Sequence, residues 1–325
     1  MSKKKTSKVT IANIVTMLGL VALALFVFCG HALQNFENNM GTNIIVSLAF
    51  VLGVLFVLWL MIHAKKVENN FGSWRFVEVT AIVLFLGASY FTGTKMMKYF
   101  VINDKMETLK EVALEDVQGL SDLIEDFVDN EKHNLNISKD DFKEAKNDKY
   151  NRKSDDVDEY LLSIRGDGTN YFNEKMANKV KAIEENKGES SKAYRETWES
   201  EIKEIEETIA DWNLIMLPDA VKHLEVLSKD MNEKLSEIAK GYDFKQVKYN
   251  DEKNIYEIEY FYPKTYKYEV KFPAMVKEAE GFSPAGLGII ILIDILVLAS
   301  YVFAYRSRKV APKAKGAFLG GAPLN

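Results

Sequence analysis

The sequence predicts a mainly α-helical integral membrane protein, with four transmembrane helices and a large helical extracytoplasmic domain that carries a small antiparallel β-meander. Three observations predict this fold class. The apolar residues are concentrated in four long runs. The stretch at 103–282 is rich in charge, with 43 Asp and Glu against 28 Lys and Arg. Near the end of that stretch, the hydrophobic period changes from about 3.6 residues to 2.

The four apolar runs are long enough to be membrane helices, because a bilayer core needs about 20 predominantly apolar residues. They extend over Ile11 to Ala32, Ile44 to Ala64, Phe76 to Tyr99 and Leu287 to Tyr305. The third run is the least apolar, with Glu78 near its start and Lys95 and Lys98 near its end. We therefore expect it to face the other helices, with its lysines reaching for the interface.

Basic residues predict the orientation of these helices. Twelve Lys and Arg residues lie on one side: Lys3, Lys4, Lys5, Lys8, Lys65, Lys66, Arg75, Arg306, Arg308, Lys309, Lys313 and Lys315. The short loop from His31 to Asn43 on the other side has none. Since short cytoplasmic loops carry an excess of Lys and Arg, we expect both termini in the cytoplasm.

These features divide the chain into five parts. We expect a cytoplasmic N-terminal tail at 1–10, three transmembrane helices at 11–102, an extracytoplasmic α-rich domain at 103–282, a fourth transmembrane helix at 283–305 and a flexible cytoplasmic tail at 306–325. Bulky residues before Cys29 replace the small residues of a cleavage site, so the first helix is interpreted as an uncleaved anchor. A single cysteine also excludes an intramolecular disulfide.

The acidic stretch begins with a helical pattern that predicts a stalk. Apolar residues recur at steps of three and four from Met106 to Phe127. From Lys132 to Asp158 the sequence is dominated by Asn, Asp and Lys, and the helical pattern is no longer visible. We interpret this stretch as a loop or a frayed helix. Two clearer helices follow, one with an apolar stripe from Trp198 to Trp212 and one with a stripe from Val221 to Ile238.

After Gly241 the pattern predicts three strands, at Phe244 to Tyr249, Ile255 to Tyr262 and Tyr266 to Phe272, within a β-meander at 244–272. The last two strands would present an aromatic face. Three strands are too few to stand alone, so this face should pack on the helices or on another chain. We therefore predict a partner or oligomer interface from aromatic residues of the domain: Tyr256, Tyr260, Tyr262, Tyr266, Tyr268, Trp198 and Trp212.

No motif in the sequence predicts catalysis, a cofactor or a metal site. The four histidines, His31, His63, His133 and His223, are scattered, and the spacing does not suit a metal or acid–base site. The carboxylates are interleaved with lysine, which is typical of a solvated helix face. We expect no enzyme.

Asp294 is an ionisable residue about halfway along the fourth apolar run. A carboxylate at that depth is costly and has a pairing or functional role by default. It would accept a hydrogen bond from Ser89, Thr92 or Thr94 on the third helix, or contact a neighbouring subunit. The alternative is a proton or ion path. Lys95 is a candidate ion-pair partner, although it should lie nearer the outer surface.

The overall architecture resembles a known family. The features that carry the likeness are the basic-flanked short loops, the stalk, the acidic exported domain and a closing helix that runs from Ser283 through Tyr301 to Arg306. Together they resemble a Bacteroidota envelope protein, and within that group the TssN-type inner-membrane subunit of the type VI secretion system. The resemblance implies a bacterial inner-membrane component, with a periplasmic domain, that anchors a contractile injection apparatus and has no catalytic residues.

The function that follows is a non-enzymatic membrane scaffold. We expect its partners to be the lipid bilayer, copies of itself and other envelope proteins of a secretion complex. The acidic balance argues against nucleic acid, because binding phosphates requires Lys and Arg. Two alternatives stay open. One is an extracytoplasmic sensor or signalling accessory that acts through a separate output protein, and the other is an ion-driven motor or transporter component built around Asp294.

Overall fold

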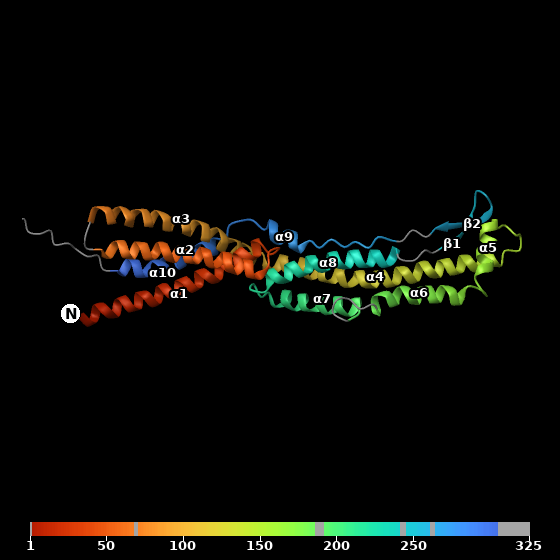
Figure 1. The fold of residues 1–325 in the computed structure, drawn as a ribbon, viewed down its shortest axis with the longest axis horizontal. Coiled ribbons are helices and arrows are strands. Elements are labelled where there is room, and N and C mark those ends of the chain that lie inside the picture. The colour runs from red at the N-terminus through yellow and green to blue at the C-terminus, as the bar shows by residue number, and fades with distance from the viewer. Residues whose placement is uncertain (1, 68–70, 186–191, 241–244, 261–263, 305–325) are drawn as a thin grey trace, which may run out of the picture. The chain divides into compact units, whose positions relative to one another are not determined.

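The computed structural model describes residues 2–67, 71–185, 192–240, 245–260 and 264–304. The chain is mostly helical and splits into two compact units. The first unit is Met1–Met106 together with Val276–Asn325, and the second is Glu107–Met275 (Figure 1). The sequence-predicted tail at 306–325 lies outside the described residues.

Among its described residues, the first unit contains four helices that are long and apolar enough to cross a membrane, which confirms that part of the predicted fold class. They are α1 (Ser2–Gln34), α2 (Met40–Lys66), α3 (Phe71–Asp104) and α10 (Pro284–Phe303). Their limits follow local signals. The Asn39 side chain accepts a hydrogen bond from the amide of Thr42 at the start of α2, and Ser283 caps α10 in front of Pro284.

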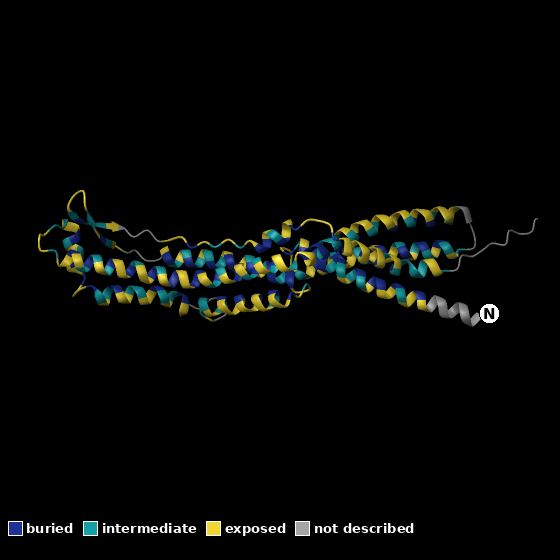
Figure 2. Cartoon of the chain, turned by 180° about the vertical axis from the view of Figure 1, so that it is seen from behind, coloured by how far each residue is buried: buried dark blue, intermediate teal, exposed yellow. Residues whose placement is uncertain are grey.

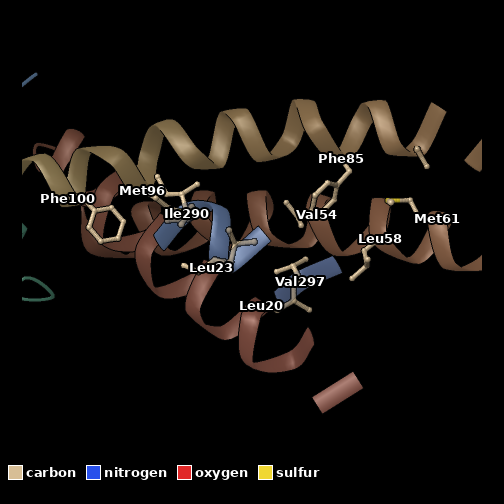
Figure 3. Packing of buried hydrophobic residues seen from close by; sticks show 13 residues of the cluster. Leu20, Leu23, Val54, Leu58, Met61, Phe85, Met96, Phe100, Ile290 and Val297 are labelled. Carbon is tan, nitrogen blue, oxygen red and sulfur yellow. The ribbon is translucent and has the colours of Figure 1, made fainter. Parts of the chain in front are cut away.

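The four helices pack around a shared apolar core. Figure 3 shows side chains from all four converging: Leu20, Leu23, Val54, Leu58, Met61, Phe85, Met96, Phe100, Ile290 and Val297. Gly30 lets α1 approach α3 closely, because a Cβ atom there would overlap the carbonyl oxygen of Lys95. Large apolar side chains also remain exposed on the outer faces of these helices (Figure 2), as lipid-facing helices require.

The second unit is built mainly from helices. They are α4 (Met106–Lys146), α5 (Asp155–Ser163), α6 (Thr169–Glu184), α7 (Tyr194–Asp211) and α8 (Leu217–Lys240), and α9 (Phe272–Glu278) begins at its end. Only Lys105 separates α3 from α4, and its amide still bonds to Val101. The predicted stalk is α4, which begins two residues after the last residue of α3.

The stretch from Lys132 to Asp158, predicted as a loop or a frayed helix, is helical in its first half. α4 continues to Lys146, because Leu135, Phe142 and Ala145 keep a helical spacing and are buried. The polar residues between these positions occupy the exposed face of the helix and hide its periodicity in the sequence.

The two predicted apolar stripes are buried in α7 and α8, which lie side by side. Trp198, Ile202 and Ile209 are nearly inaccessible to solvent on α7, as Leu224 and Met231 are on α8. The chain reverses after Asp211 through Trp212, which has a positive φ of 47°.

The sheet has two strands rather than the three predicted. β1 (Lys245–Asn250) pairs antiparallel with β2 (Ile255–Tyr260), with Val247 opposite Ile258. The stretch predicted as the third strand is not paired in this sheet. Residues 264–270 are extended but belong to no strand, and Phe272 begins α9 instead. Their backbone hydrogen-bonds to side chains of the helices.

Candidate functional site

The extended segment 264–271, which we call the strap, lies along α8 (Figure 1). Ser228, Asn232 and Ser236 are four residues apart, so they share one face of α8. Asn232 Nδ2 and Ser228 Oγ donate to the carbonyl oxygen of Tyr268 at 2.9 and 2.8 Å, and Asn232 Oδ1 accepts from its amide at 2.8 Å. Ser236 Oγ binds both backbone groups of Tyr266. Helix side chains thus replace a strand partner.

Asp116 on α4 holds the end of the strap. Its Oδ2 atom accepts hydrogen bonds from the amides of Lys271 and Phe272, each at 2.7 Å. Its Oδ1 atom accepts a longer one, at 3.4 Å, from the Tyr268 hydroxyl. Asp116 is inaccessible to solvent, and this burial raises its pKa, although the three hydrogen bonds oppose the shift.

A glycine makes room for the strap on the same helix. Gly119 lies one turn beyond Asp116, and a Cβ atom there would overlap the ring of Tyr268. Glycine lowers helix stability relative to alanine, so its place inside α4 is explained by the close approach of this ring. The strap therefore fits a groove in α4 as well as the polar stripe of α8.

A buried ion pair holds the other end of the strap. Lys179 on α6 forms a salt bridge with Glu131 on α4, and both residues are at least 97% buried. The hydroxyl of Tyr266 donates to Glu131 at 3.0 Å and accepts from the Asn130 side chain at 2.9 Å. Burial and the charge of Glu131 raise the pKa of Tyr266. This network ties α4, α6 and the strap together.

The aromatic residues predicted to form an interface belong mostly to the interior. Trp198, Trp212, Tyr256 and Tyr266 are buried within their own unit. Trp198 Nε1 donates to Asp230, and the Tyr256 hydroxyl donates to Glu144. In this chain the contacts of these four residues come from its own helices, which is one of the two packings expected for the aromatic face; the partner or oligomer interface stays a prediction.

The remaining three aromatic residues of that prediction have different positions. Tyr268 is half-buried in the strap, and Tyr260 is the last residue of β2. Tyr262 lies outside the described residues.

Asp294 is half-buried on α10, within the bundle of the first unit. Among the three predicted partners, Ser89 is the one that it meets, since the Ser89 hydroxyl donates to Asp294 Oδ1 at 3.3 Å. The hydroxyls of Thr92 and Thr94 donate to carbonyl oxygens of their own helix. The structure therefore gives this carboxylate an interhelical contact between α3 and α10.

Lys95 does not meet Asp294 in the structure. Its ammonium group donates to the side chain of Gln34 at the end of α1, at 2.5 Å. The ion pair considered from the sequence is therefore not formed, because Lys95 reaches toward the end of the bundle rather than its middle.

Further polar contacts join the apolar helices and were not predicted from the sequence. Thr16 Oγ1 on α1 donates to the carbonyl oxygen of Val297 at 3.2 Å and accepts from the amide of Ser300 at 2.9 Å. The Tyr301 hydroxyl donates to Glu78 on α3 at 2.7 Å. These polar residues lie in different apolar runs, so the sequence alone does not show which of them are in contact.

Within the described part of the chain, no group of three His, Cys, Asp or Glu side chains is arranged to hold a metal ion. The buried polar side chains above instead hold helices and the strap together. Comparison of the chain with protein-family models, curated proteins and solved structures gave no match.

Proposed function

We propose that this chain is a non-enzymatic scaffold subunit of the bacterial inner membrane, working as a homo-oligomer in a trans-envelope complex. One observation supports this function above the others: the buried charges of the second unit are used to bind structural elements. Asp116 and Glu131 hold the strap and α6. A subunit that transmits force needs such rigid ties more than it needs a reactive site.

The complex that we propose is the type VI secretion apparatus, of which this chain would be the TssN-type membrane anchor. The four apolar helices fit an anchor. The basic residues on one side of them support a periplasmic location for the acidic domain and a cytoplasmic location for both termini. The partners would then be envelope proteins of the same complex.

A sensor or signalling accessory is the second candidate, and a cavity in the second unit favours it. The cavity has a volume of about 440 Å³ and lies beside the hairpin of β1 and β2. Asp156, Glu159, Tyr160 and Lys245 line it. A small polar ligand would fit this volume.

Purification of the full chain in mild detergent separates the two candidates. The scaffold predicts a particle that contains several copies of the chain and co-purifying envelope proteins. A monomer without protein partners, stabilised by a small metabolite, would instead support the sensor.

A further inference from the structure

The first unit has a cavity at one end of its helix bundle, beyond the interhelical contacts described above. Its volume is about 380 Å³, within the range of small-ligand sites. Six of its lining residues carry the argument: Gln34, Thr94, Met97, Lys98, Val101 and Lys277. α1 ends at Gln34, and α10 begins shortly after the segment 277–281. The cavity therefore lies at one end of the apolar helices, where we expect the membrane–water interface.

Lysine side chains give this end of the bundle a positive charge. Lys98 Nζ donates to the main-chain carbonyl oxygens of Lys277 and Ala279, at 3.1 and 2.7 Å. These carbonyls orient the ammonium group without neutralising it. An ammonium group has three N–H donors, so Lys98 has one left for an anion.

Three more lysines surround the same place. Lys277 lines the cavity, Lys95 lies one turn before Lys98 on α3, and Lys105 donates to the carbonyl oxygen of Glu280 at 3.1 Å. Two carboxylates oppose them, Glu280 in the cavity wall and Glu37, which accepts a hydrogen bond from Lys277. With four lysines against two carboxylates, the local balance of these six groups is positive.

The wall of the cavity on α3 is continuous with a surface suited to lipid. Thr94 is exposed at its edge, and Phe91, one turn earlier, is 61% exposed. Met97 and Val101 form the apolar part of the lining. A ligand with a phosphate at the lysines and an apolar chain along α3 would match both the charged part and the apolar part of this site.

We propose that this cavity binds the headgroup phosphate of an anionic membrane lipid, with Lys98 and Lys277 as the phosphate ligands and the α3 surface as the acyl-chain contact. A juxtamembrane lysine contributes enough attraction to anionic lipid to change affinity roughly five-fold. The cavity is a lipid site that the scaffold function does not require.

The first test measures lipid binding to the full chain by native mass spectrometry, with phosphatidylglycerol and phosphatidylcholine as the probes. We expect tighter binding of phosphatidylglycerol, and a roughly five-fold loss for Lys98→Gln and again for Lys277→Gln. Lys203→Gln is the matched control, because Lys203 is an exposed lysine of α7 in the second unit, outside the apolar helices. Equal affinities of the wild type and both cavity variants would overturn the proposal.

The second test fills the cavity without a change in charge. Thr94→Trp should reduce phosphatidylglycerol binding, whereas Val83→Trp should not, because Val83 is an exposed position elsewhere on the same helix. Neither exposed position is needed for the core, so both variants should fold. Competition with inorganic phosphate shows whether the cavity binds a lipid headgroup or free phosphate. If phosphate alone displaces the lipid at equal concentration, the acyl chain makes no contribution and the lipid assignment is wrong.

Discussion

Replacement of Asp116 by alanine is the sharpest perturbation of the second unit. It removes one carboxylate from α4 that accepts the amides of Lys271 and Phe272 and, at longer range, the hydroxyl of Tyr268. Phe272 is fully buried, so water cannot replace the lost acceptor at its amide. The end of the strap near the start of α9 should then no longer be fixed to α4.

The magnitude follows from the two orphaned amides. An unpaired buried donor costs about 1–3 kcal/mol. We assign about 2–3 kcal/mol to the buried amide of Phe272 and about 1 kcal/mol to the partly accessible amide of Lys271. Removal of a buried carboxylate, whose pKa is raised by burial, offsets a smaller part of this cost. The expected net loss is about 2–3 kcal/mol.

Hydrogen exchange followed by mass spectrometry measures this loss directly in the full chain. A local opening that is easier by 2–3 kcal/mol speeds exchange in residues 264–272 by roughly 30- to 150-fold. Asp122→Ala is the matched control, since Asp122 is an exposed residue of α4 that accepts only the nearby Gln118 side chain among its described contacts. Unchanged exchange in Asp116→Ala would refute the role assigned to Asp116.

Three further perturbations test other contacts. Lys179→Met should destabilise the second unit by about 3–5 kcal/mol, because it leaves Glu131 buried without its cation, and adding Glu131→Leu should recover most of the loss. Thermal unfolding followed by tryptophan fluorescence, to which Trp198 and Trp212 of the second unit contribute, measures both effects. Absence of any recovery in the double variant would contradict the pairing. As the pH rises from about 4, the wild type should lose stability relative to Asp116→Asn. The reason is that the Asp116 carboxyl ionises at lower pH in the unfolded chain than in the native one, where its pKa is raised. Stabilities of the two proteins that change in parallel with pH would contradict this expected loss. Asp294→Leu should weaken the contact between α3 and α10 by about 0.6–2 kcal/mol. The Asp294→Asn protein should assemble and act nearly as the wild type in cells. An Asp294→Asn protein that assembles normally but loses all activity would support an ion path instead.

The four apolar helices could be predicted because each is long, continuous and nearly free of charge. The stripes of α7 and α8 were equally clear, since a residue such as Ile205 or Leu227 recurs every three or four positions among Glu and Lys. Such patterns are local, so the sequence alone carries them.

The strap shows why the rest could not be predicted. Tyr266, Tyr268 and Val270 alternate as in a strand, and the segment is indeed extended. Its hydrogen-bond partners, however, are Ser228 and Asn232, about 40 residues earlier. A period of two reports an extended backbone with alternating burial, but it does not report whether a strand or a helix satisfies that backbone.

A signal for this partner was present in the sequence. Ser228, Asn232 and Ser236 form a stripe of small polar residues with a spacing of four, in a helix otherwise covered with Glu and Lys. Short polar side chains on a helix are suited to hydrogen-bonding a neighbouring backbone. A large ring such as Trp198 lies in the interior of its unit, and the sequence could not show this because such rings fill a core as readily as they dock a partner.

The side of the membrane that holds the second unit is the central claim, and cysteine labelling tests it most directly. The chain has a single cysteine, the buried Cys29, so one new cysteine at an exposed lysine reports its own position. Spheroplasts with Lys203→Cys in α7 or Lys66→Cys in α2 are treated with a membrane-impermeant maleimide before and after lysis. The account predicts that Lys203→Cys reacts in intact spheroplasts and that Lys66→Cys reacts only after lysis. The reverse pattern would place the second unit in the cytoplasm and contradict a scaffold that reaches across the envelope.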